Sequence, residues 1–291
     1  MFKLAAITDE ISQDFGLACS VVKEYGGEGA EIRSVWDTKV QALTDQQIRE
    51  MRAILQDQGV LVCCIASPFF KCDLGDEQAY GEHLNILRRC LEIAHQFGTT
   101  NIIRGFTFWR KGPLQPVWDR LVESFREPIS ILEQMDGVLG IENEASCYLG
   151  TGGEVGRLLA EIDHPRVCAV WDPANQVFAR GEPAYPNGYR AVRERMVHFH
   201  IKDAAWSAQG DKARCTPIGE GEIDYRGQMR ALLQDGYQGF VSLETHWRPE
   251  QLTEEQMTRP GGAAFSSKGE YASRVCFENL VRIINEVRGN A

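Results

Sequence analysis

The 291-residue sequence has no hydrophobic run that approaches the ~20 residues a membrane-spanning helix needs. Its first ten residues, MFKLAAITDE, turn acidic too early for a secretory signal peptide. We therefore expect a cytoplasmic protein without a membrane partner. With 43% hydrophobic and 25% charged residues, the composition is that of an ordinary globular chain.

Net positive charge is also missing, because 41 acidic residues outnumber 31 lysines and arginines and leave a formal charge of -10. Proteins that bind DNA or RNA gain much of their affinity from basic side chains that release counterions from the phosphates. We therefore expect no nucleic-acid partner, although a local basic patch can lie on an acidic protein.

Cysteine pairs at zinc-binding spacing are absent. None of the nine cysteines forms a Cys-x-x-Cys pair, and Cys63 and Cys64 are adjacent. An odd number of scattered cysteines indicates buried, reduced thiols. No Gly-x-Gly-x-x-Gly motif follows the first predicted strand, which removes the main signal of a dinucleotide-binding fold.

Short β-branched runs alternate with segments of helical periodicity along the chain. The predicted strands cover residues 3–10, 29–36, 60–68, 101–109, 138–145, 167–175, 197–204 and 239–247. The helices between them include two capping boxes, Thr44 with Gln47 and Thr151 with Glu154. The helical pattern over 117–135 should break or kink at Pro128.

Eight such βα units with a final helix favour a closed (β/α)8 TIM barrel over an open doubly wound sheet. We expect a single domain that covers residues 1–291. The polar, glycine-rich stretch 248–270 follows the eighth strand and should form a long loop, either a lid or an unstructured insertion.

Polar residues gather where the predicted strands end, and in a TIM barrel the active site lies at the carboxyl ends of the strands. These residues are Asp9, Glu10, Glu31, Arg33, Ser67, Lys71, Arg104, Glu142, Asn143, Glu144, Asp172, Asn175, His198, His200, Lys202, Glu244 and His246. Unpaired buried charge is costly, so stability alone would not require so many of them. Carboxylates with an imidazole, from strands five to eight, have the chemistry of a divalent metal site.

Two histidines one residue apart, in VHFHIKDA, share a strand face with the lysine that follows. Because side chains alternate along a strand, His198, His200 and Lys202 project to one side. Such a face either satisfies polar groups of the core or builds a site.

Aromatic residues follow the same strand ends. Five of the six tryptophans lie there, namely Trp36, Trp109, Trp171, Trp206 and Trp247. A flat apolar ring beside polar groups suits the C–H face of a sugar, so we expect Trp36 and Trp109 to contact substrate. Covering the barrel mouth, or forming a subunit contact, would explain them as well.

The segments GIENEA, WDPAN, HFHIKDA and SLETHW, in this order, resemble the xylose-isomerase-like TIM barrels. That superfamily includes sugar phosphate isomerases and epimerases, ketose 3-epimerases, inosose dehydratase and the apurinic endonucleases of DNA repair. EIRSVWD and CIASPFFK resemble strands two and three of other members, so the resemblance covers nearly the whole chain.

The resemblance implies a metal site held by one residue from each of strands five to eight. The matching positions are Glu142, Asp172, His200 and Glu244. Glu144 is the rival of Glu142, and His198 is expected deeper, in the core or behind the ligands. Asn175 stands where several relatives carry a second histidine, which disfavours a multinuclear zinc site.

The implied activity is that of an isomerase or epimerase acting on a ketose, a sugar phosphate or a related polyol ketone. One divalent ion, Mn²⁺ first and Mg²⁺, Co²⁺ or Zn²⁺ as alternatives, would stabilise an enediolate. Glu142 and Glu244 would move protons, and Lys202 would polarise an oxygen. The expected substrate-binding groups are Arg33, Lys71, Arg104, Trp36, Trp109, Asn175 and His198. Salt bridges explain the first three equally well.

Three other functions stay open to different degrees. The same site would serve a lyase, such as a dehydratase of a keto-inositol or an enzyme that cleaves 3-keto-glycosides, with His246 as the acid. An apurinic endonuclease is disfavoured by the acidity and by the missing second histidine. A barrel that only binds a sugar or a partner is disfavoured because all four ligand positions are filled. Family members often form homo-oligomers, although no interface signature is visible here.

Overall fold

A computed structural model describes residues 1–180, 183–250 and 268–289. Eight strands form a closed barrel in the order β1, β12, β9, β8, β7, β6, β5, β2, with helices between successive barrel strands. The predicted (β/α)8 TIM barrel is therefore confirmed. The chain divides into two compact units, residues 1–63 with 199–291, and residues 64–198.

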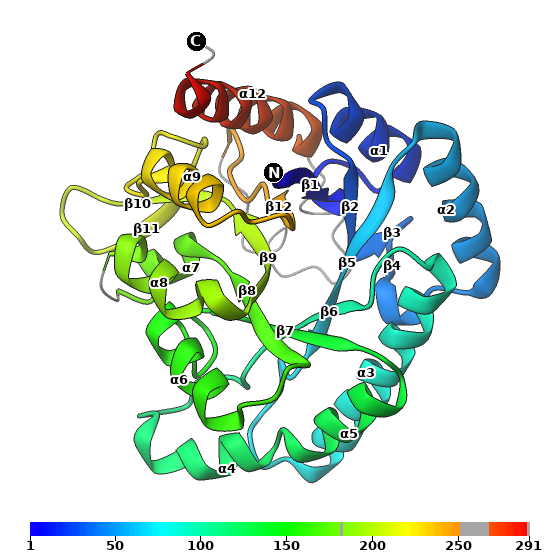
Figure 1. Ribbon diagram of the computed structural model, residues 1–291, viewed down its shortest axis with the longest axis vertical. Coiled ribbons are helices and arrows are strands. Elements are labelled where there is room, and N and C mark those ends of the chain that lie inside the picture. Colours follow the sequence, from blue (N-terminus) through cyan, green and yellow to red (C-terminus); the bar gives the residue numbers. More distant parts are fainter. Residues whose placement is uncertain (181–182, 251–267, 290–291) are drawn as a thin grey trace. The chain divides into compact units, whose positions relative to one another are not determined.

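The first unit holds both ends of the chain. Its strands are β1 (Lys3–Ile7), β2 (Gly29–Ile32), β12 (Phe240–Leu243) and the hairpin strands β3 (Ser34–Val35), β4 (Thr38–Lys39), β10 (Asp203–Trp206) and β11 (Ala213–Thr216). Its helices are α1 (Phe15–Glu24), α2 (Asp45–Gln58), α9 (Tyr225–Gln234) and α12 (Gly269–Arg288). β1 pairs in parallel with β2 and with β12, and α12 packs beside α1 and α9 (Figure 1).

The second unit continues the βα alternation. Its strands are β6 (Ile102–Gly105), β7 (Val138–Glu142) and β8 (Val167–Trp171), while β5 (Leu61–Phe69) and β9 (Met196–Ile201) each have residues in both units. Its helices are α3 (Glu77–Phe97), α4 (Trp118–Glu123), α5 (Arg126–Gln134), α6 (Gly152–Ile162), α7 (Pro173–Phe178) and α8 (Tyr189–Val192). Within this unit α3 packs on β6 and α6 packs on β8.

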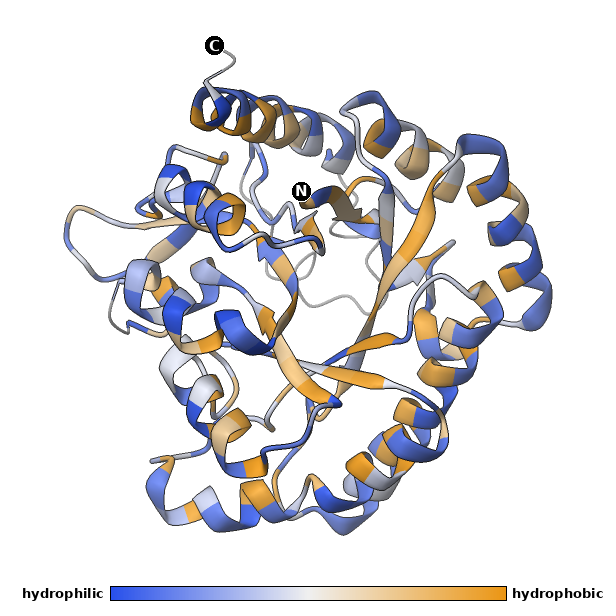
Figure 2. Ribbon diagram, in the orientation of Figure 1, coloured by the Kyte–Doolittle hydropathy of each residue, from blue (hydrophilic) through white to orange (hydrophobic). Residues whose placement is uncertain are grey.

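Hydrophobic periodicity explains which faces of these elements are buried. The strand β8 is buried along its whole length, as parallel strands covered on both faces are. The outer helices are amphipathic instead, and Figure 2 shows hydrophobic and hydrophilic residues alternating along α3 and α12. In α3 the residues Leu84, Leu87, Leu91 and Ala94 form one buried hydrophobic stripe.

The helix signals in the sequence correspond to the observed helix ends. Both capping boxes are present, at the start of α2 and of α6, and Gly59 ends α2 with the positive φ of 63° that glycine tolerates. The pattern over 117–135 breaks as expected, but between α4 and α5 rather than at Pro128. Pro128 lies in the first turn of α5, where the missing N–H would have no intrahelical partner.

Seven of the eight barrel strands end earlier than predicted, and polar residues lie at these ends. The exception is β5, which extends one residue beyond the predicted end, to Phe69. After β1 the chain forms a 3-10 turn at Thr8–Glu10, and after β8 it enters α7 at Pro173. The strand predicted over 197–204 is interrupted at Lys202, because Asp203 begins a separate hairpin. The buried Asp203 carboxylate accepts N–H groups of Ala204, Gly219 and Gly221.

Among the described residues, no helix is both long and apolar enough to cross a bilayer. The loop or lid predicted over 248–270 falls mostly on residues 251–267, which lie outside the described residues.

Candidate active site

The carboxyl ends of β7 and β8 carry two buried carboxylates. Glu142 ends β7, and its Oε1 accepts an N–H of the Asn175 side chain at 3.1 Å. Glu142 Oε2 lies 3.4 Å from Nη1 of Arg104, at the end of β6. Asp172 follows β8 and caps α7, since its Oδ1 accepts the Asn175 backbone N–H at 3.0 Å. Asn175 thus contacts both carboxylates through different groups.

Asn143, the residue after Glu142, fixes the backbone of Asp172. Its Nδ2 donates to the Asp172 carbonyl at 2.7 Å, and its Oδ1 accepts the Asp172 N–H at 2.9 Å. Asn143 is 1% exposed, so both bonds are shielded from water. One asparagine therefore ties the ends of two neighbouring strands together and sets the position of a carboxylate.

Lys71 and Arg104 lie in the same unit and are both paired with glutamates. Lys71 Nζ is 2.9 Å from Glu144 Oε2, and it lies 4.2 Å from the ring centre of Phe106 and 5.6 Å from that of Trp109. Glu144, the rival of Glu142 in the sequence, is thus the partner of Lys71. Lys71 and Trp109 are both half-exposed, so a lysine ammonium group and an indole ring lie together at the surface beside β6.

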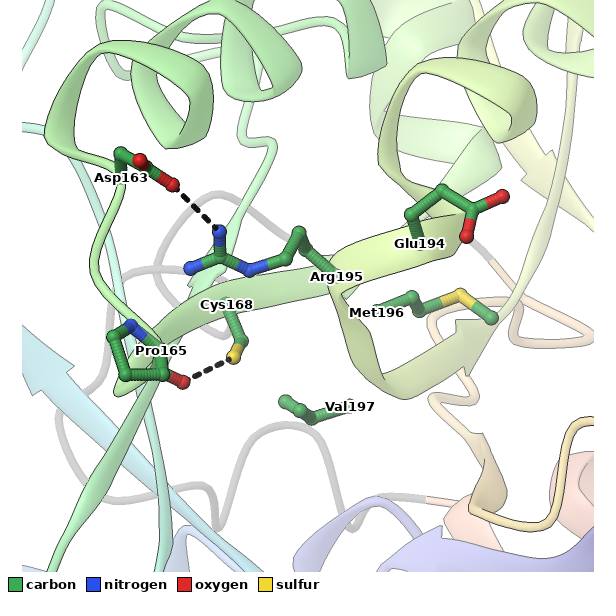
Figure 3. A pocket seen from close by; sticks show the side chains of 7 residues that line it. All are labelled: Asp163, Pro165, Cys168, Glu194, Arg195, Met196 and Val197. Carbon is green, nitrogen blue, oxygen red and sulfur yellow. Dashed lines mark hydrogen bonds and ion pairs between the residues drawn. The ribbon is translucent and has the colours of Figure 1, made fainter.

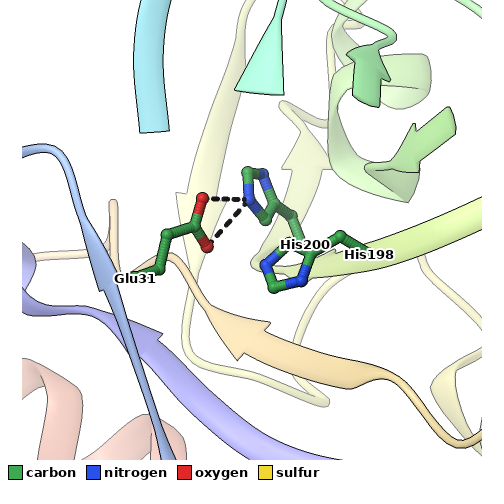
Figure 4. Close-up of side chains that lie close together, drawn as sticks. All are labelled: Glu31, His198 and His200. Atoms are coloured by element: carbon green, nitrogen blue, oxygen red, sulfur yellow. Dashed lines mark hydrogen bonds and ion pairs between the residues drawn. The ribbon is translucent and has the colours of Figure 1, made fainter. Parts of the chain in front are cut away.

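In the first unit, His200 of β9 lies in a fully buried environment. Its Nε2 is 3.0 and 3.1 Å from the two carboxylate oxygens of Glu31 (Figure 4). Its Nδ1 is 3.8 Å from Glu244 Oε2. Ser242 Oγ donates to Glu31 Oε2 at 2.7 Å. Strand register explains this contact, since Ser242 of β12 is paired with His200 of β9.

Glu244 follows β12 and is surrounded by cations. Its Oε2 lies 2.5 Å from Lys202 Nζ, and its Oε1 lies 3.3 Å from His246 Nε2 and 3.8 Å from Arg33 Nη1. Burial alone would raise the pKa of Glu244, but Lys202 and His246 outweigh it and hold that pKa well below its ordinary value. Glu244 and Glu10 in turn raise the pKa of His246 well above its usual value, against the effect of burial.

Glu10 and Asp9 are completely buried behind this group. Arg33 donates to Asp9 at 3.0 Å and to Glu10 at 2.6 Å, and Arg248 contacts the other Glu10 oxygen at 3.1 Å. Burial by itself raises the pKa of Glu10, but Arg33, His246 and Arg248 outweigh it and lower the pKa from 4.5 to about 2. The fold therefore keeps an ionised carboxylate in its interior.

This network predicts a specific dependence of stability on pH. Because the pKa of Glu10 is about 2 when folded and 4.5 when unfolded, its contribution is complete above pH ~4.5 and is lost as the pH falls toward 2. Glu10→Gln should therefore lower the free energy of unfolding by about 3 kcal/mol at pH 7. The difference from wild type should shrink by more than half at pH 3 in urea titrations.

Glu28→Gln is the matched control, since Glu28 forms an exposed ion pair with Lys3 in the same unit. Its effect should stay within about 1 kcal/mol at every pH. A Glu10→Gln effect that is equally large at pH 7 and pH 3 would contradict the ionised, buried Glu10.

Three groups of side chains in the described part of the chain could hold a metal ion. One ligand atom from each of Glu142, Asp172, His200 and Glu244 lies within 4.8 Å of the others, and all four residues are buried. Three carboxylates with one imidazole suit a hard divalent cation such as Mn²⁺ or Mg²⁺, and also Zn²⁺. The donor set therefore fits the cation that the resemblance implies.

The other two groups are Glu31 with His198 and His200, drawn in Figure 4, and Glu10 with Glu244 and His246. Guanidinium groups of Arg33 and Arg248 already contact the Glu10 carboxylate. Two fixed positive charges there oppose a further cation. The four-residue group is the most complete candidate of the three.

Two cavities lie away from these groups, both in the second unit. A cavity of about 440 Å³ is lined by residues that include Asp163, Cys168 and Arg195 (Figure 3), where β8 and β9 begin. Another, of about 300 Å³, lies among residues of α3, α4 and α5. The first cavity lies at the amino ends of these strands, opposite the carboxyl ends where TIM-barrel active sites lie. The second is lined mainly by residues of the outer helices and includes no residue of the three candidate metal groups. Neither cavity is therefore the candidate active site.

The tryptophans that follow strand ends differ in exposure. Trp36, Trp109, Trp206 and Trp247 are partly exposed, and Trp36 packs edge-on against Phe15. Trp171 is fully buried and lies beside Gly188, so it is a core residue. Contact of Trp36 or Trp109 with a substrate stays a prediction.

Sequence reasoning undervalued Glu31, Asn143 and Glu10, although each stands at a predicted strand end. Glu31 is paired in register with Ile7 of β1, so its carboxylate lies on the inward face of the strand. An acidic residue at such a position of a strand is the sequence signal that could have identified Glu31. The signal for Asn143 is an amide directly after a buried acid. No local pattern links Glu10 to His246, because 236 positions separate the two residues.

Comparison with known proteins agrees with this architecture. The family model of the xylose isomerase-like TIM barrel matches residues 19–263. Inosose dehydratase of Bacillus licheniformis is 28% identical over 150 residues, which cover 46% of this chain and 48% of the relative. Fructoselysine 3-epimerase of Escherichia coli O157:H7 is 26% identical over 181 residues, covering 59% of this chain and 62% of the relative.

The chain thus matches about half to three fifths of the length of these curated relatives. Among solved structures, the IOLI protein, which holds a zinc atom, has a TM-score of 0.78 at 17% identity, with 98% of this chain and 99% of that chain covered. At this identity the likeness concerns the fold. The matched family model covers most of the sequence, and the chain belongs to the xylose isomerase-like TIM barrel family.

Proposed function

We propose that the protein is a divalent-metal-dependent isomerase or epimerase that acts on a ketose, a sugar phosphate or a related polyol ketone through an enediolate. The observation that carries the proposal is the group formed by Glu142, Asp172, His200 and Glu244, whose ligand atoms lie within 4.8 Å of one another. These four residues would hold the cation, Mn²⁺ in the first place. When bound, it would supply Lewis acidity to a substrate carbonyl and a neighbouring hydroxyl.

The protein side chains would carry out the proton transfers. Glu142 or Glu244 removes the C–H proton next to the carbonyl, and the electron pair left behind forms the enediolate. Returning a proton from the other carboxylate to the opposite face inverts that carbon. Lys202, 2.5 Å from Glu244, donates a hydrogen bond to a substrate oxygen. The low pKa of Glu244 keeps its carboxylate ionised at neutral pH.

The same first step supports a second candidate, a lyase that acts on a keto-inositol or a 3-keto-glycoside. Here the enediolate expels the group on the next carbon instead of taking a proton there. His246 favours this outcome, because its raised pKa makes it a proton carrier at neutral pH, 3.3 Å from Glu244. It would protonate the departing oxygen. The match to an inosose dehydratase also supports this candidate.

Incubation with ketoses and keto-inositols in D₂O should separate the two reactions. An epimerase or isomerase should place one deuterium on the carbon beside the carbonyl, because the removed proton exchanges with solvent before another returns. A lyase should release water or an aglycone and yield an unsaturated ketone. Mass spectrometry and NMR of the recovered sugars measure both.

Chelator-treated protein is the control, and its activity should return when Mn²⁺, Mg²⁺, Co²⁺ or Zn²⁺ is added. If the protein catalyses no deuterium exchange and no elimination with any polyol-derived ketone, both candidate functions are contradicted. The remaining function would then be a barrel that only binds a sugar or a partner.

Several further roles belong to this proposal. Arg33, Lys71 and Arg104 would bind polar or acidic parts of the substrate. Their present ion pairs with glutamates and Asp9 would rearrange when the substrate binds. Asn175, His198, Trp36 and Trp109 would line the rest of the substrate site. Nine free cysteines support a reducing compartment such as the cytoplasm. We propose a carbohydrate substrate, no nucleic-acid partner and a homo-oligomer.

A further inference from the structure

Glu31 is a buried carboxylate that the proposed catalytic chemistry does not use. It is completely inaccessible to solvent, and both of its oxygens lie within 3.1 Å of Nε2 of His200. Ser242 Oγ holds one of these oxygens at 2.7 Å, and the Thr8 hydroxyl donates to the Glu31 carbonyl at 3.3 Å. The carboxylate is therefore held by Ser242 of β12 and His200 of β9, two strands that pair with each other in the same unit.

Strand register explains how Glu31 reaches a histidine that is 169 positions away in sequence. In parallel strands, residues paired in register point to the same face. Ser242 is paired with His200 on one side and with Ala5 on the other, and Ala5 is paired with Gly29. Ala5 carries only a methyl group, and the Phe240 ring lies against Gly29, which has no side chain. Glu31, two residues beyond Gly29, points to the same face and reaches His200.

The two nitrogens of the His200 ring face different groups. Nε2 faces Glu31, whereas Nδ1 lies 3.8 Å from Oε2 of Glu244, one of the proposed metal ligands. A neutral imidazole has one N–H and one lone pair, and only the lone pair binds a metal. An N–H at Nε2 that donates to Glu31 puts the lone pair at Nδ1, which is the nitrogen on the side of Glu244.

We propose that Glu31 is a positioning residue, which fixes the Nε2–H tautomer and the orientation of His200 so that Nδ1 can bind the cation. This inference rests on the proposed metal site. Carboxylates that hold a ligating histidine in this way raise its basicity, and their loss typically lowers metal affinity about 10–100-fold.

Two variants of Glu31 distinguish positioning from general packing. Glu31→Leu fills a similar volume but cannot accept the His200 proton, so we expect Zn²⁺ affinity, measured by chelator competition, to fall about 100-fold. Glu31→Gln retains an acceptor oxygen, and its amide can donate to Ser242, so it should lose only about 10-fold. Ser242→Ala, which removes one support of Glu31, should cost less than either. Glu161→Gln, at an exposed site on α6, should bind Zn²⁺ like wild type.

A second measurement requires no metal. With only six histidines in the chain, ¹⁵N spectra of histidine-labelled apoprotein should show the proton of His200 on Nε2 in wild type. Both tautomers should appear in Glu31→Leu. Thermal unfolding of each variant separates these effects from a loss of folding, and if Glu31→Leu fails to fold, the Gln and Ser242→Ala variants still test the role.

Three results would overturn the inference. They are a proton on Nδ1 rather than Nε2 in the wild-type apoprotein, a Glu31→Gln affinity within twofold of wild type, and two bound Zn²⁺ ions per wild-type chain that become one in Glu31→Leu. The last result would make Glu31 a ligand in its own right. If the wild-type protein binds no divalent ion, the proposed function is wrong, while the tautomer of His200 still decides the role of Glu31.

Discussion

Replacing Glu142 or Glu244 with glutamine is expected to remove nearly all activity and most of the bound metal. Each carboxylate serves twice in the proposed mechanism, as a ligand and as a proton carrier. General acid–base groups contribute about 10²–10⁴-fold to rate, so kcat/KM should fall at least ~10³-fold for either variant. Metal content, measured by atomic emission after dialysis, should fall well below that of wild type, which we expect to be about one ion per chain.

Glu144→Gln is the matched control because Glu144 lies two residues from Glu142 and pairs with Lys71 instead. That variant should retain its metal. If Glu144→Gln loses the ion while Glu142→Gln keeps it, the assignment along strand β7 is reversed. Full metal content in the Glu142→Ala/Glu244→Ala double variant would exclude both residues as ligands.

Asn143→Leu is expected to destabilise the protein by about 2–5 kcal/mol, since it leaves a buried N–H and a buried carbonyl of Asp172 without their side-chain partners. The same change should weaken metal binding, because the Asp172 carboxylate depends on the backbone that Asn143 holds. Urea unfolding measures the first effect, and chelator competition on the folded variant measures the second.

Asn101→Ala provides the comparison. Asn101 also donates to a backbone carbonyl, that of Asp136 at 3.0 Å, but at the amino end of β6 and near solvent. Its cost should be about 1 kcal/mol or less, without any change in metal affinity. If the two substitutions lower the free energy of unfolding equally, the buried hydrogen bonds of Asn143 contribute no more to stability than the exposed one of Asn101.

The acid network around Glu10 illustrates the limit of prediction from sequence. Asp9 and Glu10 were predicted at the end of the first strand, and the structure has them there. That Arg33 pairs with both, and that Arg248 approaches from the other end of the chain, followed only from the coordinates. When several charged partners are within reach of a side chain, the ion pair that forms depends on three-dimensional distances. A local sequence pattern does not give these distances.

Lys202 and His200 show the same limit at shorter range. Alternation in VHFHIKDA predicted that His198, His200 and Lys202 share one face, and His200 and Lys202 both approach Glu244. The chain nevertheless leaves the strand at Lys202, because the next residue, Asp203, caps a separate hairpin through three backbone N–H groups. Periodicity detects a strand but does not detect the hydrogen bonds that end it.

By itself the sequence determined the class of fold and the places where chemistry is concentrated. Alternating periods of two and 3.6 residues depend only on near neighbours, so eight βα units, their capping boxes and the acids at strand ends could be recognised without coordinates. Tertiary structure alone decided the pairings: Glu31 with His200, Asn175 with Glu142, and Asn143 with Asp172. Each depends on the register between strands, which sets the separation of residues that are distant in sequence.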